Sequence, residues 1–296
     1  MKTLVLGLGD SGWAAVRWLV RQGHAIRVWD SRPHPPHQQD LARGCPGAEW
    51  VTGDLDESAL QGVTQVVKTP GWPPHKEPVA TLLEAARRRA LPVLGEWDLF
   101  EQALQGLKRS QAYAPKILCI TGTNGKTTTT AWTAHLLRQA GVSAQTAGNI
   151  GPSLLDALMQ ALDANTLPQV WVVELSSFQL HDAAQPPDCD AAAITNLTPD
   201  HLDWHGSGPA YAQAKRKVLT RARVGVFNAD DAHVMSWEAD VPQAIRVGVQ
   251  APQRAQDVGL ETWQGHTWLA APEPLLKGSE LPLRGRHNAV NALMAL

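Results

Sequence analysis

The chain has 296 residues, about the length of two domains, and its formal net charge is only −2. This balance provides no overall field that would attract a nucleic acid or an anionic membrane, so we expect neither as a partner. A polyanionic ligand would need a local site of its own.

Three cysteines, Cys45, Cys119 and Cys189, lie far apart and form no Cys-x-x-Cys pair. Their spacing disfavours a disulfide framework and a zinc site, and it fits a reducing cytoplasm. No segment approaches the roughly 18 consecutive apolar residues that a membrane span needs. We therefore expect a soluble, cytoplasmic protein.

A glycine loop opens the chain, with Gly7, Gly9 and Gly12 in the G-x-G-x-x-G spacing. An apolar, strand-like run precedes the loop at residues 3–6, and an apolar-periodic, helix-like segment follows at 13–20. The order strand, loop, helix predicts a Rossmann-like nucleotide-binding domain of the α/β class.

Two acidic residues near this loop give opposite indications about its ligand. Residues 26–29 form a second strand-like run that ends in Asp30, a carboxylate able to accept hydrogen bonds from ribose hydroxyls. Asp10, in contrast, lies inside the loop, where its charge would repel a close phosphate. A tight turn without any ligand is therefore an alternative interpretation.

Two more strand-like runs, at 66–67 and 91–94, extend the first domain. A rigid, proline-rich loop at 69–74 follows the first of them, at the kind of position where open parallel sheets bind ligands. Residues 79–86 keep the apolar spacing of an amphipathic helix.

A polar stretch at 105–115 has little periodicity, and we place the domain boundary in it. The first domain then covers residues 1–110 and the second covers residues 111–296. We expect the second to be a P-loop mononucleotide-binding domain.

The second glycine loop follows an apolar run at 117–120 and precedes a helix-competent segment at 131–139. Backbone N–H groups at a helix start, the ammonium of Lys126 and the hydroxyl of Thr127 together suit the phosphates of ATP and a Mg²⁺ ion. The predicted ATP-binding residues are Gly122, Thr123, Asn124, Gly125, Lys126, Thr127 and Thr128. An ordinary turn is the alternative, but it leaves the Gly-Lys-Thr-Thr run unexplained.

Later apolar runs end in groups that ligate metals. Residues 170–173 lead to Glu174, a carboxylate at the end of a buried strand and a candidate Mg²⁺ ligand. The loop after the run 191–194 is dense in such groups, namely Asp200, His201, Asp203 and His205. This density makes metal or phosphate binding about as well supported as a structural role for the histidines.

The remaining segments predict further parts of an α/β domain. We expect a turn at 146–152, strands at 224–227 and 244–249, and a hairpin at 262–269. Residues 211–219 have helical spacing and are basic, so the spacing alone favours a solvated face for Lys215. The helical segment 286–296 ends on an apolar residue and looks cut.

Six motifs occur in order: Ile-Thr-Gly-Thr-Asn-Gly-Lys-Thr-Thr at 120–128, Gly-Asn-Ile-Gly at 148–151, Glu-Leu-Ser-Ser-Phe-Gln-Leu at 174–180, Asn-Leu-Thr-Pro-Asp-His-Leu-Asp at 196–203, Tyr-Ala-Gln-Ala-Lys at 211–215 and His-Asn-Ala-Val-Asn at 287–291. Together they resemble the Mur ligases, over the chain from residue 2 to its last residue. The third motif and the first glycine loop look most like the branch of the family that adds D-glutamate.

This resemblance implies an ATP-dependent ligase that joins D-glutamate to UDP-N-acetylmuramoyl-L-alanine through an acyl phosphate, in peptidoglycan precursor synthesis. The first domain would then hold UDP rather than a nicotinamide cofactor, with Asp10 acting through its backbone N–H. The implied substrate contacts are Asp10, Ser11, Asp30, Ser31, Arg32, Pro70, Gly71, Asn149, Ser176 and His201.

The family pattern also implies roles in the second domain. Lys126, Glu174, His201 and Lys215 would be catalytic, and Asn288 and Asn291 would meet the adenine of ATP. Two Mg²⁺ sites would be formed by Thr127, Glu174, His201 and Lys215, with Lys215 present as a carbamate. This implication opposes the solvated position that spacing favours for Lys215.

The family has a third, C-terminal domain that binds the incoming amino acid, and we expect it to be absent from this chain. The chain should therefore bind the UDP substrate as a monomer without forming the amide bond alone. Three alternatives stay open at this point. They are another amide ligase of the superfamily such as a folylpolyglutamate synthetase, an NAD-binding module fused to an NTPase, and a non-catalytic UDP-sugar-binding scaffold.

Overall fold

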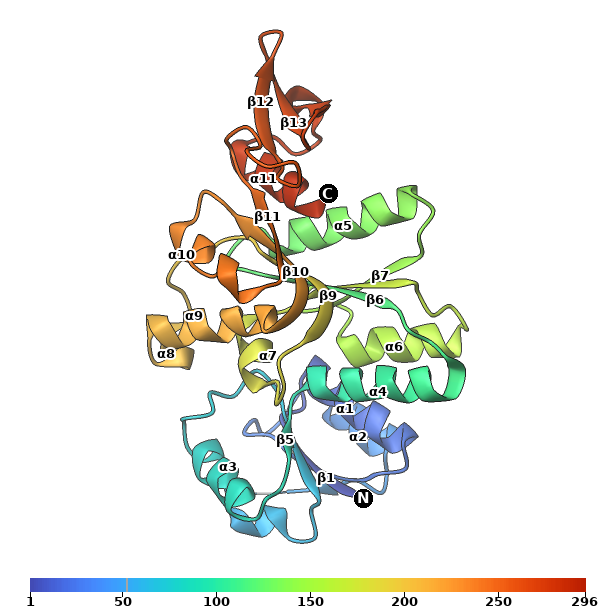
Figure 1. The fold of residues 1–296 in the computed structure, drawn as a ribbon. Helices are drawn as coiled ribbons and strands as arrows, with labels where there is room; N and C mark the ends of the chain where they lie inside the picture. The colour runs from blue at the N-terminus through green and yellow to red at the C-terminus, as the bar shows by residue number, and fades with distance from the viewer. Residues whose placement is uncertain (52) are drawn as a thin grey trace. The chain divides into compact units, whose positions relative to one another are not determined.

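The computed structural model describes residues 1–51 and 53–296, which form two compact α/β units (Figure 1). The first unit consists of Met1–Ala114, Pro152–Leu167 and His181–Gln185. The second consists of Pro115–Gly151, Pro168–Leu180 and Pro186–Leu296. None of the helices in the described part of the chain has both the length and the apolar character needed to cross a membrane.

The first unit is built on a five-stranded parallel sheet in the order β3-β2-β1-β4-β5. Its strands are β1 (Lys2–Leu6), β2 (Ala25–Trp29), β3 (Glu49–Trp50), β4 (Gln65–Lys68) and β5 (Val93–Leu94). Its helices are α1 (Asp10–Arg21), α2 (Gln38–Gly44), α3 (Val79–Arg88), α4 (Glu96–Gln111) and α6 (Leu154–Asp163). The winding direction reverses between β1 and β4, which is where doubly wound sheets bind ligands.

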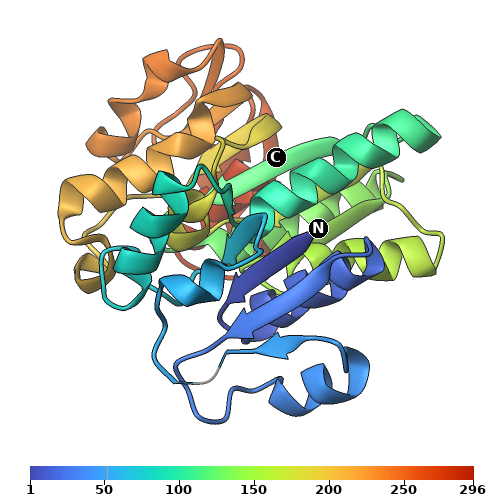
Figure 2. The same ribbon diagram turned by 90° about the horizontal axis from the view of Figure 1, so that it is seen from below.

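Helices cover both faces of this sheet, whose strands are the dark blue to teal arrows in Figure 2. Leu4 and Leu6 of β1 pack with Leu82 and other apolar side chains of α3. Helix α1 packs against β1 and β2 and is joined by α4 and α6. The crossover from β1 to β2 and the crossover from β4 to β5 run in opposite directions along the sheet, so right-handed connections place α1 and α3 on opposite faces. Burial on both sides explains the continuous apolar runs of these strands.

The second unit contains a six-stranded parallel sheet in the order β11-β10-β9-β6-β8-β7. Its strands are β6 (Lys116–Thr121), β7 (Ala144–Gly148), β8 (Val170–Glu174), β9 (Asp188–Ile194), β10 (Arg221–Asn228) and β11 (Gln243–Val247). Its longer helices are α5 (Lys126–Gln139), α9 (Gly208–Arg216) and α11 (Arg286–Ala295), and its short ones are α8 (Leu202–His205) and α10 (Ala232–Met235). Helix α7 (Ser177–Asp182) begins in this unit and ends in the first.

The carboxyl ends of the central strands meet at one edge of the second sheet. Glu174 at the end of β8 is in register with Ile120 of β6 and with Gly148 of β7. Thr121 at the end of β6 is in register with Ile194 of β9. The loops that follow these four strands are therefore brought together at this edge.

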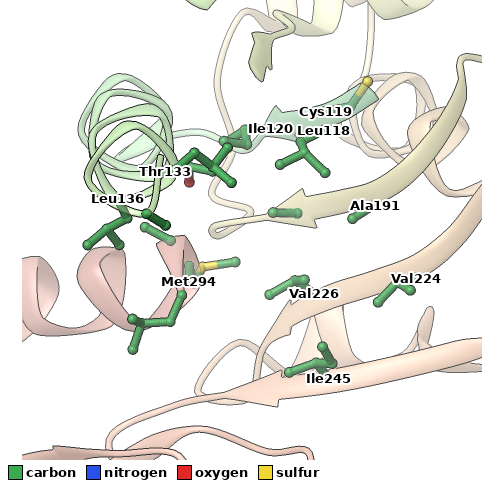
Figure 3. A pocket seen from close by; sticks show the side chains of 15 residues that line it. Leu118, Cys119, Ile120, Thr133, Leu136, Ala191, Val224, Val226, Ile245 and Met294 are labelled. Carbon is green, nitrogen blue, oxygen red and sulfur yellow. The ribbon is translucent and has the colours of Figure 1, made fainter. Parts of the chain in front are cut away.

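Helices α5 and α11 pack side by side against this sheet (Figure 1). Figure 3 shows an apolar pocket of about 430 Å³ in this region, where sheet residues such as Val226 and Ile245 face Leu136 of α5 and Met294 of α11. A separate antiparallel sheet is formed by β12 (Gly259–Trp263), β13 (His266–Ala270) and β14 (Pro274–Lys277). The pocket lining contains no charged side chain, so this pocket does not fit a phosphate.

Three segments differ from the sequence-based expectation. The polar stretch that begins at residue 105 is the last part of α4 as far as Gln111, where most residues are exposed and no buried face requires an apolar period. Residues 146–148, expected in a turn, are the end of β7. Helix α6 belongs by its contacts to the first unit, although its sequence lies between two strands of the second.

Candidate functional site

The first glycine loop lies at the reversal between β1 and β4. Gly7 has φ +100°, and a Cβ there would overlap the Thr69 hydroxyl, while a Cβ at Gly12 would overlap the Gly7 carbonyl oxygen. Thr69 Oγ1 also donates to the Leu6 carbonyl oxygen at 2.8 Å, which holds the loop after β4 against the glycine loop. Only glycine permits this close approach of backbone to backbone.

Helix α1 starts at this loop with Gly9 as its N-cap and without a side-chain cap. The N–H groups of its first residues, Asp10 and Ser11 included, have no acceptor within the helix and point toward the loop opening. Such a helix start is suited to an anion because the helix dipole adds partial positive charge. The arrangement fits the diphosphate contacts expected of both residues.

Asp30 is held inside the protein at the end of β2. Its carboxylate accepts hydrogen bonds from the Leu8 N–H at 2.7 Å and from the backbone and guanidinium of Arg32 at 2.7–2.9 Å. Burial alone would raise the pKa of Asp30, but the bonds from Arg32 and Leu8 lower it. Because these groups already occupy the carboxylate, the exposed Ser31 and the half-exposed guanidinium of Arg32 are better placed to meet a nucleoside.

The loop after β4 contains Pro70 and Gly71 and is anchored by a buried ion pair. Lys68 Nζ lies 2.6 Å from Asp182 Oδ2 and donates to the Thr69 carbonyl oxygen at 3.2 Å. The side chains of Lys68 and Asp182 are only 2% and 3% exposed. The predicted substrate loop thus starts from a fixed point.

The second glycine loop uses the same backbone device at the end of β6. Gly122 has φ +143°, and a Cβ there would overlap the Thr195 hydroxyl. Thr195 follows β9 and donates to the Asn124 carbonyl oxygen at 2.6 Å, while Asn196 Oδ1 accepts from the Asn124 N–H at 2.9 Å. The residues directly after β9 therefore support the loop that follows β6.

Tyr211 of α9 also contacts this loop. Its hydroxyl lies 2.8 Å from Thr123 Oγ1, a distance at which either oxygen can donate. Thr123 Oγ1 accepts as well from the Thr198 N–H at 3.0 Å. The loop is thus fixed from β9 and from α9 together.

Two lysines meet at one carbonyl of this loop. Lys126 Nζ donates to the carbonyl oxygens of Gly122 and Thr123 at 3.1 and 2.9 Å, and Lys215 Nζ donates to that of Gly122 at 2.6 Å. Burial lowers the pKa of Lys126. Burial, and then the charge of Lys126, lowers the pKa of Lys215 to about 7. Lys215 is 2% exposed, so the solvated position favoured by its spacing is wrong.

Thr127, Glu174 and Asn149 converge beside the loop. Thr127 Oγ1 donates to Glu174 Oε2 at 2.9 Å, and Asn149 Nδ2 donates to Glu174 Oε1 at 2.7 Å. A hydroxyl and a carboxylate at this separation are oxygen donors of the kind that Mg²⁺ prefers, so the residues fit that ion. In the described part of the chain, no three His, Cys, Asp or Glu side chains group as a metal site by themselves. Water or substrate phosphate oxygens would have to complete the coordination.

The other predicted residues of this edge have protein partners. His201 has φ +50°, and its ring lies 4.7 Å from the ring of Phe178 and 3.5 Å from Asp200 Oδ2. Ser176 Oγ accepts from the Gln179 N–H at 3.1 Å, at the start of α7. The ring centroids of His201 and Tyr211 are 6.4 Å apart, so His201 lies near the glycine loop that Tyr211 contacts. Among the described residues, no contact joins His201 to Glu174.

The two asparagines expected at adenine lie in different settings. Asn291 is buried and touches the glycine loop, since a Cβ at Gly125 would overlap its amide oxygen. It also lines a pocket of about 220 Å³ with Asp230 and His287. Asn288 Nδ2 donates to the Arg284 carbonyl oxygen at 2.9 Å, and Asn288 is not among the lining residues. Asn291 is therefore the better placed of the two for a base.

The fold and these sites define a nucleotide-binding protein of two doubly wound units, the second of which contains a phosphate loop. Residues 120–296 match the Mur ligase middle domain, and residues 1–95 match the MurD-like N-terminal domain of Mur ligases. The chain belongs to the Mur ligase family.

Curated relatives have similar sequences over nearly the whole chain. It is 45% identical to the UDP-N-acetylmuramoylalanine–D-glutamate ligase of Bordetella avium and 44% identical to that of Ralstonia nicotianae. Both alignments cover 99% of this chain and 64% of the relative. The chain thus spans about 64% of the length of these relatives.

Solved structures share the fold. A UDP-N-acetylmuramoyl-L-alanyl-D-glutamate–2,6-diaminopimelate ligase matches with a TM-score of 0.56 and 24% identity, over 79% of this chain and 57% of that one. UDP-N-acetylmuramate:L-alanyl-gamma-D-glutamyl-meso-diaminopimelate ligase from Neisseria meningitides matches with a TM-score of 0.58 and 18% identity, over 99% and 91%. Both likenesses confirm the two-unit α/β architecture.

Sequence reasoning missed several residues that shape the two sites. Thr69 and Thr195 support the two glycine loops, and Tyr211 reaches Thr123 from α9. His37 bonds to Asp10 from a segment that has no motif. Each threonine follows a strand next to the loop strand, so only the sheet order could have indicated it.

Proposed function

We propose that this chain forms the UDP-substrate-binding and ATP-binding parts of an ATP-dependent acid–amino-acid ligase. The reaction would join D-glutamate to UDP-N-acetylmuramoyl-L-alanine, a step in the synthesis of peptidoglycan precursors. The observation that carries the proposal is the convergence of Lys126, Lys215, Thr127 and Glu174 on one phosphate loop. The 45% identity to a ligase with this name supports the choice of substrates.

The chemistry follows from charge. A carboxylate is a poor acyl donor because it is anionic and would have to expel oxide. Transfer of the γ-phosphoryl group of ATP to the carboxylate oxygen makes an acyl phosphate, and the amine of D-glutamate then displaces phosphate through a tetrahedral intermediate. Positioned cations offset the repulsion between a carboxylate and a triphosphate.

The chain's own residues fit this sequence of steps. The N–H groups at the start of α5 and the ammonium of Lys126 would bind the outer phosphates. Asn149, held by Glu174 at 2.7 Å, would orient the muramoyl end. Bound Mg²⁺ would supply charge neutralisation at the transferred phosphoryl group, and Thr127 and Glu174 are the residues that would hold it.

Lys215 fits the carbamate expected of it. Its pKa of about 7 leaves a large fraction of the amine neutral near neutral pH, and a neutral amine can add to carbon dioxide. The amine nitrogen forms a bond to the carbon of carbon dioxide, the electrons of one C=O π bond move to oxygen, and the nitrogen releases a proton to solvent. The resulting anion would remove the like-charge repulsion with Lys126 and would offer an oxygen ligand to a second Mg²⁺. Carbon-13 NMR after incubation with labelled bicarbonate would detect the carbamate, and a K215M variant should lack the signal.

The enzyme would act in the cytoplasm as a monomer, use two Mg²⁺ ions and serve cell wall growth during cell division. Its UDP-linked substrate and ATP are both water-soluble nucleotides, which agrees with that location.

Isothermal titration tests the proposal on the chain as it stands. UDP-N-acetylmuramoyl-L-alanine, UDP and NAD are titrated in turn, and ATP with Mg²⁺ is titrated separately. We expect the tightest binding with the muramoyl compound, weaker binding with UDP and none with NAD. Binding of NAD without binding of either uridine compound would reject the proposal and favour a dinucleotide module fused to an NTPase.

A further inference from the structure

A negative side chain stands where the first unit should receive a diphosphate. Asp10 is the first residue of α1, directly after the loop Gly7–Gly9, and its side chain is 91% exposed. The backbone there is suited to an anion, because the first N–H groups of a twelve-residue helix lack acceptors. Backbone and side chain therefore act in opposite directions on a phosphate.

His37 joins Asp10 to a second carboxylate. Its Nε2 lies 2.9 Å from Asp10 Oδ1, and its Nδ1 lies 2.8 Å from Asp40 Oδ2. The ring is stacked on Trp13 of α1, with centroids 6.0 Å apart and planes 14° from parallel, and the side chain is 23% exposed. The preceding Pro35 and Pro36 restrict the backbone that carries it.

The chemistry of the ring decides its charge. A neutral imidazole has one N–H donor, whereas both nitrogens of His37 face a carboxylate oxygen, and such oxygens only accept when ionised. Both hydrogen bonds can form together only in the imidazolium. Burial alone would lower the pKa of His37, but the bonds to Asp10 and Asp40 raise it.

The other charges around this cluster come from α1, α4 and α6. The guanidinium of Arg17 lies over the Trp13 ring, 5.6 Å from its centroid, and pairs with Asp156 of α6. Glu96 of α4 lies near Ser11 and accepts a hydrogen bond from the Leu155 N–H of α6 at 3.1 Å, and burial raises the pKa of Glu96 to about 7. Loss of the His37 proton adds one net negative charge directly at the loop.

We propose that the His37 imidazolium neutralises Asp10 at the start of α1 and thereby sets the affinity of the first unit for the diphosphate of its substrate. The inference rests on the proposed function, because it takes the UDP-linked compound as the ligand of this loop. His37 is a positioning residue here, since it acts on the ligand through the charge and orientation of Asp10. Diphosphate binding is then coupled to proton uptake by His37.

The test is titration calorimetry with UDP-N-acetylmuramoyl-L-alanine at about pH 6 and about pH 8.5, on either side of the ordinary histidine pKa near 6.5. The diphosphate diester of this ligand does not itself titrate in that range. Affinity of the natural chain should be about three- to tenfold lower at the higher pH, because one charge is added a few ångströms from the diphosphate.

Three substitutions separate charge from structure. H37Q should bind at both pH values with the weaker affinity that the natural chain has at high pH. D10N should bind at both with about the affinity that the natural chain has at low pH. E96Q should keep the difference in affinity between the two pH values, which distinguishes the titration of His37 from that of Glu96. H34Q is the matched control in the same segment and should also keep this difference.

The outcomes distinguish the inference from the function beneath it. Binding with the same affinity at both pH values, or a pH difference that persists in H37Q, overturns the role of His37 and leaves the proposed function standing. A D10N variant that binds more weakly at both pH values also overturns it. If the natural chain binds no uridine compound at either pH, the proposed function and this inference both fail.

Discussion

The two glycine loops of this chain share a backbone and differ in charge. In each, the first glycine has a positive φ and packs against a threonine hydroxyl from the loop after the adjoining strand, Thr69 for Gly7 and Thr195 for Gly122. In each, a helix begins directly after the loop. The first loop contains Asp10, whereas two lysines, Lys126 and Lys215, bond to the second.

Under the proposed function, the same local fold would bind a diphosphate in the first unit and ATP in the second. Backbone N–H groups at a helix start are sufficient to bind an anion that does not react, and a neutralised carboxylate can stand beside it. Under the proposed function the second loop would also support phosphoryl transfer, which needs positive charge near the reacting oxygens, and two lysines bond to this loop. Side chains around a similar backbone would then separate binding from chemistry.

The largest effect should come from removing the cation of the second loop. Lys126→Ala should weaken ATP binding about 100-fold, because a charged partner of the phosphates is lost from a partly buried site. Titration calorimetry with ATP and Mg²⁺ measures this. Affinity for UDP-N-acetylmuramoyl-L-alanine should stay unchanged in the same variant, and an equal loss for both ligands would contradict the division of tasks.

The interactions that hold Thr69 and Thr195 in place should contribute differently to stability. Lys68→Met leaves Asp182 buried without its main partner and should lower the free energy of unfolding by about 3 kcal/mol. Thr195 is held instead by a neutral bond, in which Asn228 Nδ2 donates to its carbonyl oxygen at 2.7 Å. Asn228→Ala should cost only about 1 kcal/mol. Urea unfolding compares the two, and equal losses would mean that the ion pair has no special weight.

Because Gly7 and Gly122 have similar backbone settings, their substitution should lower the free energy of unfolding by similar amounts. Gly7→Ala and Gly122→Ala should each lower the free energy of unfolding by about 2–3 kcal/mol, since both combine a positive φ with overlap of a threonine hydroxyl. Gly9→Ala is the control, because Gly9 has φ −84° and nothing lies near its Cβ position. It should change stability by less than about 0.5 kcal/mol. A large loss in Gly9→Ala would show that the loop tolerates no side chain anywhere.

The smallest effect concerns Glu96, the buried carboxyl group that accepts a hydrogen bond from Leu155 of α6. Burial raises the pKa of Glu96 from 4.5 to about 7, so the folded state binds more protons than the unfolded state between these values. The free energy of unfolding should therefore fall as the pH rises from about 4.5 to about 7. Glu96→Gln should remove this fall and gain about 1–2 kcal/mol near pH 8. Urea unfolding across the pH range checks both, and a variant that keeps the slope would assign it to another group.

The local sequence was sufficient to predict the strands and helices that flank the two glycine loops. Apolar runs that are followed by glycine loops and helix-like spacing predicted β1, α1, β6 and α5, because hydrophobic period and backbone freedom are local properties. The motifs also predicted that the second loop and Glu174 bind phosphate and Mg²⁺, and in the structure Thr127 and Asn149 both donate hydrogen bonds to that carboxylate. Residues that directly follow a strand could be predicted as site residues without knowledge of the strand order in the sheet.

Tertiary structure decided what depends on the order of strands and on burial. The basic spacing around Lys215 predicted solvent, yet packing of α9 buries the amine against the Gly122 carbonyl oxygen and lowers its pKa to about 7. Helix α6 joins the first unit although the chain around it belongs to the second. His37 reaches Asp10 across 27 positions. Such contacts join residues that are distant in sequence, and the energy of a buried charge depends on all its neighbours, so no local pattern could contain them.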